Sequence, residues 1–245
     1  MLLVMPAPVV AQDGGHEAGP VRRAISVIGR DLKALASSDS VTLLSSATAL
    51  ALLASPFDET LTHQASSSTF LKTTFDGWAR RVGQEWALGS GALATFIVGR
   101  ATGHARTATV GGDLIEAQVV SGVMTVALKY AVDRERPDGE ARSFPSGHAA
   151  GTFATATVIH RHYGWKASVP AYAAAVLVSG ARLQANSHYA TDVIAGAAVG
   201  VLAGRAVTFD IAGSQVSMAP IKLTGGAAVT FHVKPGRRSS AVAKP

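Results

Sequence analysis

Apolar runs of helical length follow one another along most of the chain, and they restrict it to a fold built from packed helices. The runs are longer than strands usually are, which predicts helices and not strands. Glycine contributes 25 of the 245 residues, and alanine is also frequent, so the helix backbones can approach closely. The sequence therefore predicts an all-α helical bundle of about six core helices, over residues 41–56, 86–99, 113–132, 146–162, 167–183 and 189–207.

The two ends of the chain differ from this core. Residues 25–35 carry isoleucine and leucine at helical intervals, which predicts an N-terminal amphipathic helix. Near the other end, alternating apolar and polar residues flank Thr224-Gly225-Gly226, a pattern typical of a small C-terminal β-hairpin packed on the bundle. We therefore divide the chain into a signal-like or flexible N-terminus (1–20), the bundle domain (21–210), and the hairpin with a basic tail (211–245).

Composition alone does not distinguish a membrane bundle from a soluble one. Hydrophobic residues make up 48% of the chain and charged residues 16%, a balance shared by membrane bundles and by tightly packed soluble ones. A membrane-spanning helix needs about 20 consecutive apolar residues, and most of the runs are shorter. This favours a soluble or membrane-seated bundle over a protein with six spans.

The first residues resemble the back half of a secretory signal. The apolar run MLLVMPAPVV is followed by Ala11, a suitable cleavage position, although no positively charged segment precedes the run. We expect export to the cell envelope, with the protein either periplasmic or membrane-associated and its functional site on the exported side.

Net charge and cysteine content narrow the ligands. The chain carries a formal charge of +6, which suits a nucleic acid, a membrane surface or a phosphorylated small molecule. No basic stripe with interleaved aromatic residues is present, which argues against nucleic acid. The absence of cysteine excludes disulfides, thiolate zinc sites and cysteine nucleophiles. We expect a phosphorylated small molecule or a lipid phosphate, with a membrane surface as a further partner, and the sequence indicates no oligomeric state.

Cations gather where the run over residues 113–132 ends, in the stretch KYAVDRERP. Lys129, Arg134 and Arg136 stand there, with Pro137 directly behind them. Basic residues at a helix C-terminus stabilise its partial negative charge, so capping alone would explain them. A binding site for an anion would explain them too.

Ser146, Gly147 and His148 open the next predicted helix. Serine is a favoured N-cap, and a glycine beside it leaves backbone N–H groups open to an anion. His148 would lie in the first helical turn, either as a packing residue or beside that anion. A serine nucleophile is disfavoured because no G-x-S-x-G elbow surrounds Ser146.

The third cluster holds Arg182, His188 and Asp192. The histidine and the aspartate are four residues apart, so one helical face can bring the carboxylate to one imidazole nitrogen while the other nitrogen points outward. A carboxylate that fixes the tautomer in this way makes histidine a nucleophile. An ordinary ion pair on a helix surface is the alternative.

Together, the spacings K-x6-R-P, P-S-G-H and R-x5-H-x3-D resemble the three signature motifs of the type 2 phosphatidic acid phosphatase superfamily. This superfamily includes bacterial non-specific acid phosphatases and vanadium haloperoxidases. The motifs occur in order between residues 129 and 192. One position departs from the pattern, because the family's third motif usually begins Ser-Arg and here Ala181 precedes Arg182.

The resemblance implies a phosphate pocket and a set of catalytic residues. His188 would attack phosphorus and form a phosphohistidine, Asp192 would orient its imidazole, and His148 would protonate the leaving oxygen. Arg134 falls outside the motif and is interpreted as a solvated charge. No metal or other cofactor is implied, and vanadate is expected to bind as a phosphate analogue. The implied phosphate ligands are Lys129, Arg136, Ser146, Gly147 and Arg182.

The implied activity is that of a metal-independent phosphatase acting on phosphomonoesters or pyrophosphates, with lipid-linked substrates favoured. Two alternatives use the same pocket: a soluble non-specific acid phosphatase and a vanadate-dependent haloperoxidase. The motifs do not distinguish substrates. Selectivity is expected from residues 57–85 and 100–112, which carry no motif.

Overall fold

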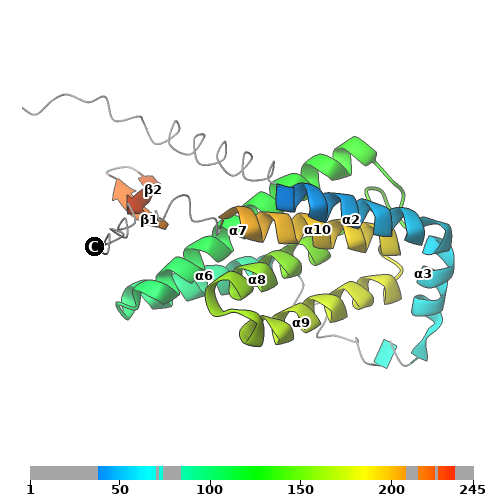
Figure 1. Ribbon diagram of the computed structural model, residues 1–245, viewed down its shortest axis with the longest axis horizontal. Helices are drawn as coiled ribbons and strands as arrows, with labels where there is room; N and C mark the ends of the chain where they lie inside the picture. Colours follow the sequence, from blue (N-terminus) through cyan, green and yellow to red (C-terminus); the bar gives the residue numbers. More distant parts are fainter. Residues whose placement is uncertain (1–37, 70–71, 74–83, 208–214, 224–225, 235–245) are drawn as a thin grey trace, which may run out of the picture.

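The computed structural model describes residues 38–69, 72–73, 84–207, 215–223 and 226–234. Most of these residues form a bundle of long helices (Figure 1), which confirms the all-α prediction. The predicted amphipathic helix over 25–35 and the signal-like N-terminus lie outside the described residues. The six predicted core helices correspond to α2 (Ser38–Ala54), α6 (Glu85–Ala101), α7 (Ala105–Val132), α8 (Gly147–Tyr163), α9 (Trp165–Gln184) and α10 (Ala190–Val207).

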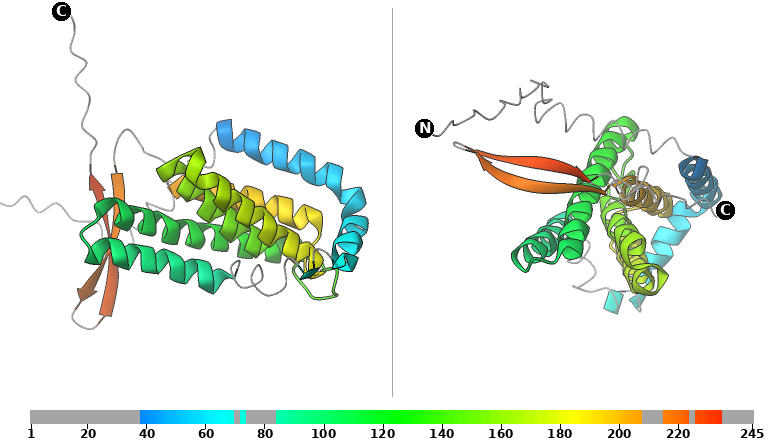
Figure 2. Two further views of the ribbon diagram at one scale, coloured as in Figure 1. Left: turned by 90° about the horizontal axis from the view of Figure 1, so that it is seen from below. Right: turned by 60° about the vertical axis from the view of Figure 1, so that its left-hand side comes forward.

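One further helical segment follows α2 in a stretch that the sequence marked only as polar. A short 3-10 turn, η1 (Ser55–Phe57), leads directly into α3 (Asp58–Ser67). The first turn of α3 is acidic, and carboxylates there stabilise the positive end of a helix. α2 lies along the outside of the bundle against α10, and α3 turns across one end of it (Figure 2).

The packing of α8 against α10 brings two helix starts together. A Cβ added at Gly196 would lie 2.4 Å from the backbone oxygen of Ser146, and one added at Gly200 would lie 2.2 Å from that of Ala150. Only glycine fits at so close an approach, because any side chain would push the two backbones apart. The glycines on α10 therefore set the first turn of α10 beside the first turn of α8, where two of the three motifs lie.

α7 is longer than its apolar run indicated. It spans 28 residues and begins at Ala105, whereas the pattern predicted a start near residue 113. The additional turns have the sequence ARTATVGG, whose small and polar residues show no apolar periodicity, and α7 packs on α6. Helix packing extends α7 where the sequence pattern did not.

Large apolar side chains cover much of the outer surface of the bundle. Leu50, Leu52 and Leu53 of α2 are 56%, 68% and 71% exposed, and more exposed apolar residues lie on α6, α7 and α9. A surface of this kind marks contact with lipid or with another protein. Three helical segments are long and apolar enough to cross a membrane: Ser38–Ser67, Ala105–Val132 and Ala190–Val207. Because α3 continues α2 and α7 begins before residue 113, two of these segments are longer than the apolar runs predicted there.

Two strands follow the bundle near the C-terminus. β1 (Gln215–Leu223) and β2 (Gly226–Lys234) pair antiparallel, with a register that runs from Gln215 opposite Lys234 to Leu223 opposite Gly226. The turn predicted around Thr224 falls partly outside the described residues. Packing of a hairpin on the bundle stays a prediction.

Candidate active site

Helix direction brings the three motif clusters to one end of the bundle. α7, α8, α9 and α10 run in alternating directions, so the C-termini of α7 and α9 meet the N-termini of α8 and α10 (Figure 1). Lys129 lies in the last turn of α7 and Arg182 in the last turn of α9, while Ser146 caps α8 and Asp192 lies in the first turn of α10. The N-termini of α8 and α10 therefore add partial positive charge at the end of the bundle where the cationic side chains lie.

The cations of the first motif are held by the loop that joins α7 to α8. The Lys129 ammonium donates to the backbone oxygen of Arg142 at 2.6 Å. Arg136 pairs through Nη1 with the Glu140 carboxylate at 2.8 Å, and its buried Nε–H has no hydrogen-bond partner in the described part of the chain. A buried donor without a partner is costly unless a ligand accepts from it. Arg136 is thus fixed at one end and retains a donor for an anion.

The second motif forms the start of α8, as its sequence predicted. Ser146 is fully buried, and its Oγ accepts from the backbone N–H of Ala149 at 3.5 Å, which is the expected N-cap geometry. The backbone N–H of Ser146 donates to the backbone oxygen of Asp192 at 2.9 Å. This hydrogen bond ties the second motif directly to the third.

His188 and Asp192 approach each other in the interior. The separation between His188 Nδ1 and Asp192 Oδ2 is 3.7 Å, and the two side chains are only 3% and 0% exposed. That distance is an ion-pair distance, too long for a hydrogen bond, and Nδ1 has no hydrogen-bond partner among the residues that the structure describes. His188 precedes α10 and does not share a helical face with Asp192; the carboxylate reaches back past Tyr189, whose backbone N–H donates to Oδ2 at 2.8 Å.

Other donors to the Asp192 carboxylate come from residues that the motifs do not include. Ser143 donates its hydroxyl proton to Oδ2, and Arg134 donates through Nη1 to Oδ1 at 3.0 Å. Arg134 also pairs with Asp58 at the start of α3. The interpretation of Arg134 as a solvated charge is therefore wrong. In the sequence, only its position two residues before Arg136 indicated that Arg134 lies near the site. Asp58 could not be recognised as its partner, because α3 was not predicted.

The positive charges and burial act together on two histidines. Burial first, and then the charge of Arg182 and those of Arg136 and Lys129, lower the pKa of His148 to about 4. Burial also lowers the pKa of His188, which Lys129 and Arg182 lower further while Asp192 raises it. Both imidazoles are therefore neutral at neutral pH, and cations from the first and third clusters lie near them. A neutral imidazole keeps the lone pair that a nucleophile needs.

A cavity of about 210 Å³ opens between α7 and α8 beside this cluster. Small and apolar residues make up much of its wall, and it reaches Gly147 at the start of α8. A group attached to a phosphate at the helix start would have room there. The lining residues are Gln118, Val119, Ser121, Gly122, Thr125, Gly147, Ala150 and Gly151.

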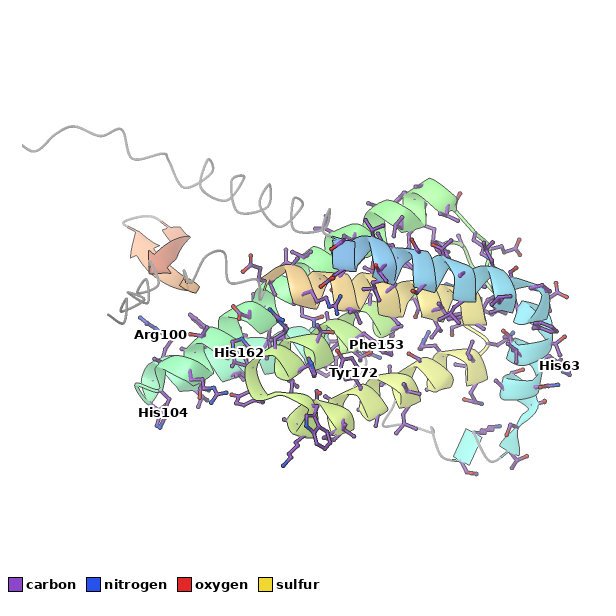
Figure 3. The ribbon with its side chains drawn as sticks, in the orientation of Figure 1. His63, Arg100, His104, Phe153, His162 and Tyr172 are labelled. Carbon is purple, nitrogen blue, oxygen red and sulfur yellow. The ribbon has the colours of Figure 1, made fainter. Side chains whose placement is uncertain are left out.

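The described residues contain no group of three or more histidine, cysteine, aspartate or glutamate side chains that could hold a metal ion. The far end of the bundle carries Arg100, His104 and His162, well away from α3 and the site end (Figure 3). The candidate site is therefore spatially separate from His104 and His162.

Residues 111–212 match the sequence pattern of the PAP2 superfamily, and this range contains every motif residue described above. These residues make up less than half of the chain, and over them it is similar to members of the PAP2 superfamily. The resemblance read from the motifs is thereby confirmed.

Two curated relatives match parts of this chain. It is 47% identical over 87 residues to a lipid A 1-phosphatase of Porphyromonas gingivalis, covering 34% of this chain and 20% of that protein. It is 30% identical over 100 residues to a lipid A 4'-phosphatase of Helicobacter pylori, covering 36% of this chain and 50% of that protein. The matched region thus spans half or less of these relatives.

Two solved structures have a fold similar to that of this chain. Aquifex aeolicus LpxE aligns with a TM-score of 0.52 and 23% identity, over 62% of this chain and 94% of that one. The first transmembrane PAP2-type phosphatidylglycerolphosphate phosphatase of Bacillus subtilis aligns with a TM-score of 0.53 and 21% identity, over 68% of this chain and 92% of that one. At these identities the likeness concerns the fold.

Proposed function

We propose that this protein is a membrane-associated, metal-independent phosphatase that removes a phosphate from a lipid-linked phosphomonoester or pyrophosphate. The observation that carries the proposal is the meeting of three motif cations, two helix N-termini and two neutral histidines at one end of the bundle. Phosphoryl transfer depends on such fixed positive charge, because charge must be stabilised on the phosphoryl oxygens in the transition state. The two lipid A phosphatases with matching sequence support a lipid substrate.

The geometry supports a two-step reaction through His188. Nδ1 faces Asp192, so Nε2 is the nitrogen that attacks phosphorus, forming an N–P bond as the P–O bond to the leaving group breaks. His148 gives the leaving oxygen its proton. Water then attacks phosphorus, His148 takes a proton from this water, and the N–P bond breaks to release inorganic phosphate.

His148 needs a proton for the first step, and its pKa of about 4 in the empty site would leave it neutral. The charges that lower this pKa are those of Arg182, Arg136 and Lys129, besides burial. A bound phosphate dianion offsets these charges, so substrate binding raises the pKa of His148 and equips it as the acid. The phosphate ligands would be Lys129, Arg136, Arg182, Ser146 and the backbone N–H of Gly147.

The outer surface supports a place in the membrane. The site lies at the ends of α7 and α10, two of the three segments long enough to span a bilayer. A site at the ends of spanning helices lies at the height of lipid headgroups, where the phosphates of lipids are found. The cavity between α7 and α8 gives room for the part of the lipid next to its phosphate. Exposure on the periplasmic side stays a prediction.

A substrate panel on purified protein tests this function. The panel would contain a lipid phosphomonoester, an isoprenoid pyrophosphate and p-nitrophenyl phosphate, presented in detergent micelles with a chelator. We expect turnover with the lipid substrates to exceed that with p-nitrophenyl phosphate, and loss of about 10³-fold or more in His188→Gln. The matched control His104→Gln replaces a histidine at the far end of the bundle and should keep wild-type turnover. Wild-type activity in His188→Gln, or none in the wild type, would refute the assignment.

A further inference from the structure

We infer that Arg134 and Asp58 form a positioning pair that holds the Asp192 carboxylate, and through it His188, in the attacking geometry. The inference rests on the proposed phosphatase function. Arg134 Nη1 donates to Asp192 Oδ1 at 3.0 Å, and Nη2 of the same guanidinium donates to Asp58 Oδ2 at 3.0 Å. One arginine therefore bridges two carboxylates from segments that are far apart in the sequence.

Asp58 fastens this bridge to the beginning of α10. Its Oδ1 accepts from the backbone N–H of Thr191 at 3.0 Å, and its Oδ2 accepts from the Thr191 hydroxyl at 2.6 Å. The first backbone N–H groups of a helix have no partners within the helix, so Asp58 satisfies one of these donors from outside. Thr191 directly precedes Asp192. Arg134 Nη1 also donates to the Thr191 Oγ1 at 2.7 Å. α3 is thus joined to the turn that carries the candidate nucleophile.

Burial makes the charge of Arg134 necessary. Asp192 is fully buried and Asp58 is 4% exposed, so two anionic carboxylates lie close together away from water. Buried carboxylates without a counter-charge are costly, and each hydrogen bond to a guanidinium offsets part of that cost. The guanidinium also stacks on the Tyr189 ring at 4.0 Å from its centre, which keeps the fork in one orientation.

The two oxygens of Asp192 have different partners. Oδ2 faces His188 and accepts from Ser143 and from the Tyr189 backbone, whereas Oδ1 accepts from Arg134. His188 Nδ1 has no hydrogen-bond partner in the described residues, so its orientation depends on the carboxylate beside it. If Arg134 is lost, Oδ1 loses its anchor and the carboxylate can turn, which moves Oδ2 away from the imidazole.

This arrangement separates positioning from phosphate binding. The contacts of Arg134 lead to Asp58, Thr191, Asp192 and Tyr189, and none of them leads to Lys129, Arg136 or Arg182. A change at Arg134 or Asp58 should therefore slow the chemical step while leaving substrate binding almost unchanged. A purely structural role would lower the amount of folded protein without this split between kcat and KM.

Kinetics of four variants, measured with the wild type in the same detergent, test the inference. Arg134→Gln removes the charge, Arg134→Lys keeps the charge without the fork, and Asp58→Asn removes one carboxylate. We expect kcat to fall by about tenfold or more in Arg134→Gln and Asp58→Asn, with KM within about twofold of wild type. Arg134→Lys should recover part of the loss. The double variant should be no slower than Arg134→Gln alone, because the two residues act as one unit.

The far end of the bundle offers a matched control. Arg106 donates to the backbone oxygen of His162 and stacks over Tyr163 at 4.6 Å, while the Asp113 carboxylate lies 2.6 Å from His162 Nε2. Arg106→Gln and Asp113→Asn therefore remove the same residue types from a similar network away from the site. Both should keep wild-type kcat per folded molecule.

Each outcome decides between explanations. A wild type without phosphatase activity overturns the proposed function itself. An active wild type with kcat unchanged in Arg134→Gln and Asp58→Asn overturns the positioning role alone. If Arg134→Gln does not fold, Asp58→Asn decides by the same measurement. If neither variant folds, or if KM rises as much as kcat falls, the pair serves stability or binding, and the inference is wrong.

Discussion

Replacing Gly196 with alanine should separate the two motif-bearing helices and so disturb the site without touching a catalytic side chain. The added Cβ would lie 2.4 Å from the backbone oxygen of Ser146, and 3.0 Å from the Ala149 Cβ. A carbon and an oxygen ordinarily approach no closer than about 3.3 Å, so the backbones must move apart by about 1 Å. Overpacking of this kind lowers the free energy of unfolding by about 1–3 kcal/mol. Alanine has a better helix propensity than glycine, which offsets about 0.5–1 kcal/mol of this loss.

The displacement acts directly on the bond between the second and third motifs. Ser146 N–H donates to the Asp192 backbone oxygen at 2.9 Å, and Gly196 lies one turn beyond Asp192. A misplacement of about 1 Å in a catalytic site can lower the rate by about 10²-fold. We therefore expect Gly196→Ala to lose about 1–2 kcal/mol of unfolding free energy and about 10²-fold in kcat.

Thermal unfolding and steady-state kinetics, both in detergent, measure these two effects. Gly91→Ala on α6 is the matched control, because a Cβ there meets nothing within 4 Å. It should keep wild-type kcat and unfold at an equal or slightly higher temperature. Wild-type kcat and stability in Gly196→Ala would refute the argument that close contact of α8 and α10 builds the site.

Three further predictions follow from the site and the surface. The pKa of His148 is lowered from 6.5 to about 4, so between these pH values the unfolded chain binds more protons than the folded one. The free energy of unfolding should therefore fall as the pH is lowered from 6.5 to about 4, and it should fall less in His148→Gln. Unfolding temperature measured against pH checks this. Vanadate should inhibit competitively, and Arg136→Gln should weaken this inhibition by about tenfold or more. Leu50→Arg, on the exposed face of α2, should lower the membrane-bound fraction in cell fractionation, whereas Leu50→Ala should not.

The sequence predicted the bundle because its apolar runs have the length of helices, which is a local signal. The motif spacings named the candidate site residues, and the structure brings the elements that carry them to one end of the bundle. The boundaries that it missed depend on contacts between distant segments: the first turns of α7 pack on α6, and α3 is held by the bond between Asp58 and Thr191. Polar residues that form such bonds look the same in sequence as residues of a loop.

The role of Arg134 shows the same limit within the site. Its neighbours Lys129 and Arg136 could be assigned because the family motif names them, whereas the partners of Arg134 are a residue 76 positions away and another 58 positions away. The predicted helix over 189–207 already left His188 outside it, but the sequence did not show that the Asp192 carboxylate reaches back to the backbone N–H of Tyr189. Long-range pairing of polar side chains depends on the tertiary structure.

Trapping of the covalent intermediate tests the central claim most directly. A phosphorylated substrate labelled at phosphorus would be mixed with enzyme, quenched under alkaline denaturing conditions that preserve a phosphohistidine, and the labelled residue located by peptide mass spectrometry. We predict label on His188 in the wild type and none in His188→Gln. Label on Ser146 or on any other residue, or turnover that continues in His188→Gln, would contradict the mechanism.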